Sequence, residues 1–429
     1  MTTLTRLPLG RAHMLVSSAI RDVRRAGLPI EALFPLGSLR RYAPDVGDVA
    51  LLAIARTRLH REVLAAFGRL PSVTGILGDT ATSITATTSR GDVTLHVADP
   101  VHAGAALVWH TGTRAHTEQL RLRAKRLGFY FGEAQLTRAN GGDIATISET
   151  DLYRELGLPY IAPELRESDE AIAAAERGSL PALVSDLHIC GDLHMHSSWS
   201  DGRDTIEMMV TAAKQLGYDY VAITDHSERA WSSRKLAASD VAAQRAEIDA
   251  IRTAIAGITI LHGIEVDIMK DGSLDFDDAL LEGFDIVLAS LHDHGGQTGQ
   301  RLTERYLSAI RHPLVNVITH PANRSPGQSR GYDLDFDALF EAAVETGTAM
   351  EVDGAPGHLD LDGALARRAV AAGVMLTIDS DCHRADALAR QMRFGVGTAR
   401  RGWVEPRHVL NTRPVDAVRE FIARKRARR

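Results

Sequence analysis

The sequence predicts an α/β fold with a parallel barrel in its C-terminal half. Short apolar runs of the kind that form buried parallel strands alternate with helical stretches. A histidine or a carboxylate follows each of these runs, and in α/β barrels the strand ends meet at one face, where such groups form a site. The apolar runs are residues 220–224, 258–261, 286–290, 314–319 and 374–378.

Helical stretches connect the predicted strands along the chain, at residues 204–217, 240–255 and 362–373. The order strand, helix, strand is therefore repeated, as the crossovers of a parallel sheet require. The last helix and strand, within residues 357–384, extend the barrel nearly to the end of the chain. A polar stretch at residues 164–186, which contains the breaker Gly-Ser-Leu-Pro, predicts a domain boundary ahead of the barrel.

A series of potential metal ligands accompanies the strand ends. The segment GDLHMHSSWSDG, residues 191–202, opens the series, and DSDCHR, residues 379–384, closes it. Imidazole and carboxylate donors suit zinc, manganese or iron, and a carboxylate such as Glu265 can bridge two ions. The series therefore predicts a multinuclear metal centre and a metallohydrolase. Four further residues flank the series, and we expect supporting or plain loop roles for Asp225, Asp267, His294 and Asp379.

Length and composition fit an ordinary intracellular protein of two or three domains. The chain has 429 residues, a net charge of −6 and two cysteines, Cys190 and Cys382. The N-terminus lacks the apolar stretch of a signal peptide, and no run is long enough to span a bilayer. We therefore expect a cytoplasmic location and no membrane partner. The net charge gives no global attraction to nucleic acid, so any such binding must use local patches.

Over roughly residues 190–410 these motifs resemble the PHP (polymerase and histidinol phosphatase) domain. The resemblance implies a distorted (β/α)7 barrel that holds three divalent ions, Mn²⁺ or Zn²⁺, with Fe as a further option. It implies one ion held by His194, His196, Glu265 and Asp381, a second by Glu265, His292 and His320, and a third by Asp201, His226 and His383. Of these ligands His194, His196, Glu265, Asp381 and His383 would carry the catalysis.

The N-terminal half resembles the palm and thumb of bacterial family X DNA polymerases, which precede a PHP domain in the same order. The segments that carry this resemblance are residues 37–53, 110–129 and 151–167. The resemblance begins at the palm, without the helix-hairpin-helix region that helps family members to grip DNA. It implies a palm-like α+β nucleotidyltransferase domain at 1–100, a small thumb-like domain at 101–165, a linker at 166–189 and the PHP domain at 190–429.

The palm-like part departs from the family where nucleotidyl transfer needs carboxylates to hold two metal ions. The Asp-x-Asp pair of the family reads Asp48-Val49-Ala50 here, and Thr94 stands where a later Asp is expected. We therefore expect an inactive polymerase half. Residues that remain in the pattern are expected to contact phosphates of DNA or a nucleotide. They are Gly37, Ser38, Arg40, Arg41, Gly112 and Arg114.

The family resemblance implies a metal-dependent phosphoesterase that processes DNA 3′ ends, mainly as a 3′-5′ exonuclease. Its partner would be a DNA 3′ end in DNA repair. One alternative is a phosphatase of the histidinol phosphatase type that acts on a small phosphomonoester, since the same ions would hydrolyse either ester. Another is a non-catalytic DNA-binding repair scaffold, in which metals only stabilise the barrel. Protein partners are not indicated.

Overall fold

The computed structural model describes residues 6–132, 134–230 and 232–427. The chain divides into two compact units, Met1–Leu180 and Pro181–Arg429, and each is described by itself. The division falls inside the expected linker, residues 166–189. That range also contains helix α7 (Glu170–Glu176), and the side chain of Arg166 is fully buried in the first unit. The finer division into palm, thumb and linker stays a prediction.

The first unit contains a mixed sheet with the strand order β2-β4-β7-β6-β5. All residues of β4 are buried, and alternate ones, Ala50, Leu52 and Ile54, pack in one apolar cluster with helix α4 (Ala103–Thr111). Strands β4 and β7 run parallel, and the other neighbours are antiparallel. The strands are β2 (Ala32–Pro35), β4 (Ala50–Ile54), β5 (Val73–Asp79), β6 (Ser83–Thr88) and β7 (Gly91–Ala98), and the helices α1 (Leu9–Ala26), α2 (Gly37–Arg40) and α3 (His60–Gly68) accompany them.

The thumb-like part of this unit joins helices to a small antiparallel sheet. Its charged core is Glu149, whose carboxylate accepts two hydrogen bonds of 2.7 Å from Arg40 and one of 2.9 Å from Arg166. Because Glu149 begins α6 and Arg40 ends α2, this buried cluster ties the two helices together. The elements here are α5 (Arg114–Arg126), α6 (Glu149–Glu155), β8 (Phe129–Gly132), β9 (Gln135–Arg138) and β10 (Asp143–Ile144).

The second unit is a parallel barrel of seven strands in sequential order, which confirms the predicted fold. Beyond β11 and β17 a parallel bridge joins Met195 to Cys382, and the amide of His196 donates to the Cys382 carbonyl at 2.9 Å. The first and last strands are thereby connected. The strands are β11 (Gly191–Asp192), β12 (Tyr220–Ile223), β13 (Thr259–Asp267), β14 (Ile286–Ser290), β15 (Val317–Ile318), β16 (Ala349–Asp353) and β17 (Leu376–Asp379).

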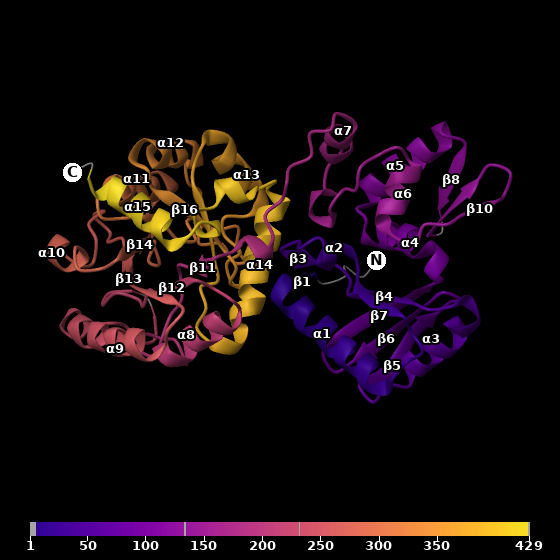
Figure 1. Ribbon diagram of the computed structural model, residues 1–429, viewed down its shortest axis with the longest axis horizontal. Helices are drawn as coiled ribbons and strands as arrows, with labels where there is room; N and C mark the ends of the chain where they lie inside the picture. The colour runs from indigo at the N-terminus through magenta and orange to yellow at the C-terminus, as the bar shows by residue number, and fades with distance from the viewer. Residues whose placement is uncertain (1–5, 133, 231, 428–429) are drawn as a thin grey trace. The chain divides into compact units, whose positions relative to one another are not determined.

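Helices cover the outside of this barrel (Figure 1). They pack on it through one large apolar cluster, to which α11 contributes Tyr306 and Ile310. A second cluster fills the barrel interior, where Tyr220, Leu261 and Ile286 meet side chains of α15 (Val415–Arg426). The other helices are α8 (Ile206–Gln215), α9 (Val241–Ala254), α10 (Asp278–Leu281), α11 (Gly299–Arg311), α12 (Phe336–Thr346), α13 (Gly363–Ala372) and α14 (Leu388–Arg401).

Four strands differ from the sequence expectations. Strands β11 and β16 were not expected, because β11 is only two residues long and β16 carries carboxylates within its apolar run. Strand β13 extends to Asp267, so Glu265 lies within a strand and not after it. Strand β15 keeps only two residues of the predicted run 314–319. Among the described residues no helix is long and apolar enough to cross a membrane.

Candidate metal centre

The predicted ligands meet at the C-terminal ends of the barrel strands. His194 and His196 follow β11, and because side chains alternate in extended chain, both enter the centre while Met195 packs in the apolar core. Asp381 and His383 follow β17 in the same alternating way. The other ligands come from β13 and from the segments that follow β11, β12, β14 and β15. All nine predicted ligands lie in this region of the barrel.

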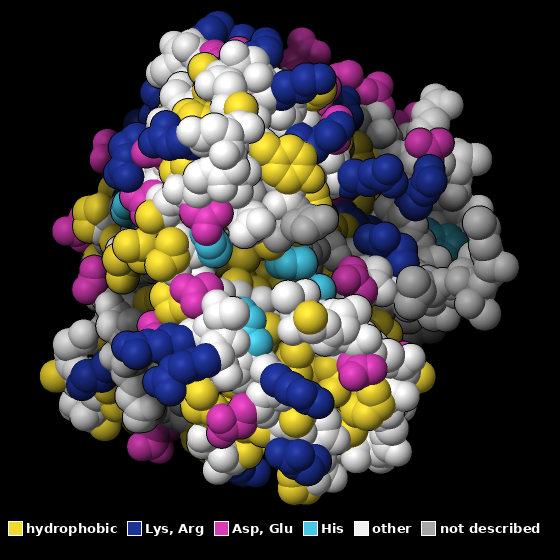
Figure 2. Space-filling view, turned by 90° about the vertical axis from the view of Figure 1, so that its right-hand side faces the viewer, with side chains coloured by type: hydrophobic (Ala, Val, Ile, Leu, Met, Phe, Trp, Pro, Cys, Tyr) yellow, Lys and Arg dark blue, Asp and Glu magenta, His cyan; other side chains and the backbone are white. Residues whose placement is uncertain are grey.

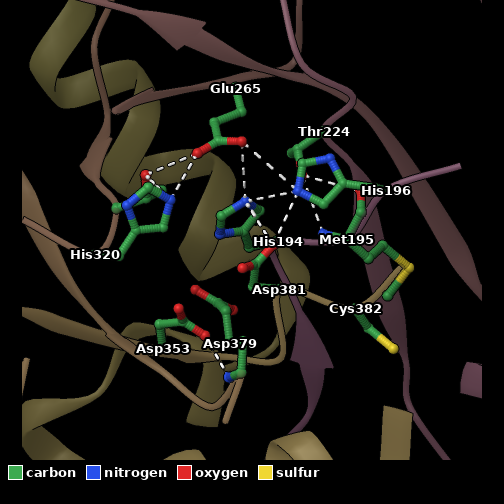
Figure 3. Close-up of polar contacts among 12 residues, drawn as sticks. His194, Met195, His196, Thr224, Glu265, His320, Asp353, Asp379, Asp381 and Cys382 are labelled. Carbon is green, nitrogen blue, oxygen red and sulfur yellow. Dashed lines mark hydrogen bonds and ion pairs between the residues drawn. The ribbon is translucent and has the colours of Figure 1, made fainter. Parts of the chain in front are cut away.

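Glu265 faces His320 on one side and His194 and His196 on the other (Figure 3). One carboxylate oxygen is 3.5 Å from Nε2 of His194 and 3.6 Å from Nε2 of His196. The other oxygen is 2.9 Å from Nε2 of His320 and 3.6 Å from Nε2 of His292. Asp381 completes the first set, with Oδ1 3.0 Å from Nε2 of His196. Glu265 thus faces two groups of imidazoles, as a bridging carboxylate would.

A third group lies toward the solvent. Oδ1 of Asp201 is 3.2 Å from Nε2 of His383 and 3.5 Å from Nε2 of His226. The side chain of His383 is 34% exposed, whereas those of His194 and Glu265 are fully buried. Nδ1 of His226 also lies 2.6 Å from Glu265, so this group adjoins the other two. The open side of the centre is therefore the side of Asp201 and His383.

The donor set fits divalent cations. Nδ1 of His194 is 2.7 Å from a Glu351 oxygen, and a proton held there would leave Nε2 to offer a lone pair to a cation. That Nε2 is 3.1 Å from Nε2 of His196, and both face the carboxylates of Glu265 and Asp381. Lone pairs that converge in this way repel one another unless a cation lies among them. The residues present therefore suit metal ions.

Imidazoles and carboxylates of opposite charge lie close together in the buried part of the centre. Burial alone would lower the pKa of His194, but the nearby carboxylates of Glu351, Glu265 and Asp381 raise that pKa well above its usual value. Burial likewise would raise the pKa of Glu265, but His226, His194 and His292 hold it well below its usual range. The Glu265 carboxylate is therefore anionic and available as a ligand.

Carboxylates behind the ligands fix the imidazole rings. Glu351, on β16, accepts from Nδ1 of His194 and, with its second oxygen, from the amide of His320 at 2.9 Å. Asp267 lies 3.0 Å from Nδ1 of His292. Asp225 instead accepts hydrogen bonds from Ser197 and Ser200 in the loop that carries Asp201. Such contacts set the tautomer and direction of a ligand ring.

Sequence reasoning missed Glu351. It lies on the strand β16, whose apolar run TAMEV is interrupted by the glutamate itself. A search for a seventh strand between α12 and α13 would have found it, because a closed barrel needs a strand there. Asp353 and His358 were missed for the same reason.

Backbone angles in the left-handed region, φ 26° at His320 and 48° at Asp381, also mark the centre as strained.

In the first unit, five of the six expected phosphate contacts line one cavity of about 750 Å³. Gly37, Ser38, Arg41, Gly112 and Arg114 line it, together with Asp48 and Trp109. Arg40 is different, because its guanidinium group is held by Glu149 and Thr111 in the buried cluster. Arg40 therefore has a structural role in the described contacts.

The positions at which the family resemblance expects acidic residues lie on the adjacent strands β4 and β7. Ala50 on β4 and Thr94 on β7 are register partners in the parallel pair, and Asp48 precedes β4 by two residues. Two neutral side chains thus stand where adjacent strands would place acids. Asp92 is exposed and lies two residues before Thr94, as Asp48 lies two residues before Ala50.

Comparisons with known proteins agree with this architecture. Residues 106–167 match the family model of the DNA polymerase beta thumb, and residues 192–323 match that of the PHP domain. The chain is 36% identical over 392 residues to a "DNA polymerase/3′-5′ exonuclease PolX" of Bacillus subtilis (strain 168). This match covers 90% of this chain and 68% of the relative.

Other relatives match about half of the chain. A "Probable phosphatase" of Syntrophotalea carbinolica is 27% identical over 250 residues, 56% of this chain and 98% of the relative. Another, from Shewanella oneidensis, is 30% identical over 207 residues, 46% of this chain and 77% of the relative.

The fold and the donor set define a hydrolase of the PHP class. The whole chain belongs to the family X DNA polymerases that carry a C-terminal PHP domain.

Proposed function

We propose that this protein is a metal-dependent 3′-5′ exonuclease that processes DNA 3′ ends. The observation that carries the proposal is the buried carboxylate of Glu265, which faces the imidazoles of two ligand groups within 3.6 Å. We assign one ion to His194, His196, Glu265 and Asp381, a second to Glu265, His292 and His320, and a third to Asp201, His226 and His383. Mn²⁺ or Zn²⁺ suits these donors, and Fe is a further option.

Divalent ions held by these residues would supply Lewis acidity, which activates water and neutralises charge that develops on a phosphate during hydrolysis. The residues of the chain provide the rest. Glu351 and Asp267 hold the rings of His194 and His292 in one orientation, so that their Nε2 atoms face the centre. The ester approaches from the side of Asp201 and His383, where the centre is open to solvent.

The N-terminal unit supports DNA as the substrate. Its thumb match and the similarity to an exonuclease that is also a DNA polymerase favour a protein that holds a primer end. The cavity in this unit offers the guanidinium group of Arg114 and backbone amides to phosphates, whereas Arg41, which also lines it, is held by Glu167 and the Thr111 carbonyl. The face shown in Figure 2 mixes Lys and Arg with Asp and Glu, so binding would rely on local contacts rather than on a uniformly basic surface.

A second candidate is a phosphatase for small phosphomonoesters. It is favoured by the similarity of the barrel unit to relatives named as probable phosphatases. A third, a DNA-binding repair scaffold with structural metals, is opposed by the open, partly exposed edge of the centre at His383. Structural metal sites are usually closed by protein ligands.

One experiment separates these functions. Manganese-loaded protein is incubated with a 5′-labelled DNA primer and, in parallel, with histidinol phosphate, and Asp381→Ala is the matched control. We expect a ladder of shortened primer that the control does not produce. Phosphate release with an intact primer would replace the proposal with the phosphatase. No turnover of either ester, with unfolding of the control, would support a structural metal.

A further inference from the structure

We propose that the centre contains one more divalent-cation site, formed by Asp353, His358 and Asp381. Two of these residues lie outside the nine ligands assigned above, so this inference goes beyond the proposed function. The ligand would be a transition-metal ion such as Mn²⁺ or Zn²⁺, because the donors are one imidazole and two carboxylates. Asp381 would then bridge two ions, as Glu265 does on the other side.

The fold places the three residues at one point of the barrel rim. Asp353 ends β16 and is the register partner of Asp379 on β17, two residues before Asp381. His358 belongs to the loop that follows β16, and its ring stacks on that of His320 with centroids 4.8 Å apart. Figure 3 shows the carboxyl groups of Asp353, Asp379 and Asp381 on the side of the centre away from Glu265.

Two of the three residues carry a buried donor atom without a protein partner among the described residues. Asp353 is fully buried, and its Oδ1 accepts from the Ala355 amide at 2.5 Å. Its Oδ2 is buried without a hydrogen-bond partner among the described residues, and Nδ1 of His358 is in the same condition. Groups of this kind are costly to leave unpaired in the interior of a protein, and a bound cation would supply the missing partner.

The spacing suits a cation. One donor atom from each of the three residues lies within 4.8 Å of the others. Ligand atoms at about 2.0–2.3 Å from a common ion are about 3–4.6 Å apart, so small side-chain movements would close the site. Within the described part of the chain His358 forms no direct ion pair with either carboxylate, so the imidazole is not already committed to one of them.

Charge also points to a cation. Asp353 is buried beside Asp381 and Glu351, and the oxygens of Glu351 are both used by His194 and His320. Like charges in the interior are costly unless an opposite charge lies among them. An ion between Asp353 and Asp381 would provide that charge at the point where the unpartnered oxygen lies.

Metal content tests the proposal without using activity. The full-length protein is stripped with a chelator, reloaded with Mn²⁺, and its bound metal is measured by mass spectrometry. The variants are Asp353→Asn and His358→Phe, and the second keeps the ring that stacks on His320. His294→Phe is the control, because His294 is a nearby loop histidine outside the ligand groups. We expect each site variant to bind one equivalent less than the wild type and the control.

An anomalous-scattering map of the manganese-loaded wild type gives a second measurement. A peak between Asp353, His358 and Asp381 is expected, and it decides the matter if a variant fails to fold or loses every ion. Equal metal content in all four proteins, or density for water only, would overturn the proposal. Either of these results leaves the phosphoesterase assignment intact, because that assignment depends on turnover and on Asp381→Ala.

Discussion

At the scale of single residues, the buried glutamates Glu265 and Glu351 of the barrel have different contacts. Both oxygens of Glu265 face imidazoles, Oε2 those of His194 and His196 and Oε1 that of His320. Glu351 uses both oxygens, one for Nδ1 of His194 and one for the amide of His320. We therefore infer that Glu265 binds ions, whereas Glu351 orients two of the residues that bind them.

Glu351→Gln tests this difference. The amide oxygen can still accept from one partner, but the NH₂ group cannot accept from the other, and the negative charge behind His194 is lost. We expect metal affinity and hydrolysis to fall by about 10–100-fold, the usual effect of removing such a supporting carboxylate. Mn²⁺ titration and initial rates measure both. Glu341→Gln, on the exposed face of α12, is the control, and equal affinities in the two variants would contradict the assigned role.

Residue types and spacing indicated that the strand ends carry metal-binding groups, and the resemblance to the PHP domain supplied the nine ligand candidates. All nine predicted ligands gather in one region, although their individual roles stay proposals. The contact of Arg40 could not be predicted, because Glu149 is 109 residues away and nothing local marks the pair. Glu351 was not predicted because a glutamate inside an apolar run argues against a buried strand. In this barrel the glutamate side chain points into the centre.

At the scale of elements, the same limit explains which strands were found. Strands β12 and β14 are apolar throughout or nearly so and were predicted. Strand β16 alternates Met350 and Val352, which pack outward, with Glu351 and Asp353, which serve the centre. A strand that supplies carboxylates to a site therefore loses the continuous apolar signature by which buried parallel strands are recognised.

The cluster of Arg40, Glu149 and Arg166 ties α2 to α6, and it should make the first unit sensitive to acid. Burial would raise the pKa of Glu149, but hydrogen bonds and charge from Arg40 and Arg166 lower it below its usual value. Its stabilisation is thus present above the unfolded pKa, about 4.5, and is lost as the pH falls through the folded pKa. We expect Glu149→Gln to reduce the free energy of unfolding at pH 7 by about 3–5 kcal/mol, because Arg166 is left buried and unpaired.

Urea unfolding at several pH values measures this effect. The difference between the wild type and Glu149→Gln should be largest at neutral pH and should shrink in the acid range. Glu118→Gln breaks an exposed ion pair with Arg121 and should change little, because exposed pairs are screened by solvent. A constant difference across the pH range would show that the carboxylate charge is not what stabilises the cluster.

At the scale of the whole molecule, the two units differ in the groups that they offer to metal ions. The barrel unit assembles its donors, whereas the palm-like sheet pairs Ala50 with Thr94 where two acids would be needed. We expect no templated nucleotide incorporation by the wild-type protein with Mg²⁺ or Mn²⁺, since transfer requires ions that neutralise the developing charge. A primer-extension assay with Asp381→Ala, which removes the proposed exonuclease, measures this. Extension that persists in that variant would show an active palm.

Metal removal should affect the two units differently. In the barrel unit Asp201, Glu265 and Asp381 come from separate segments, so ions would join β11, β13 and β17 and compensate buried charge. Chelation would therefore loosen the strand ends, because metal binding and folding are coupled when ligands are gathered from distant positions. Hydrogen exchange resolved by peptide should increase at residues 191–202, 262–267 and 379–384.

Strand β4 of the first unit is the internal reference for this experiment. Its exchange should not change on chelation, because its buried residues pack against α4 and contribute no ligand. Adding Mn²⁺ back should restore protection at the strand ends of the barrel alone. Equal exchange with and without chelator in both units would mean that the barrel donors hold no ions, and it would remove the physical basis of the proposed hydrolysis.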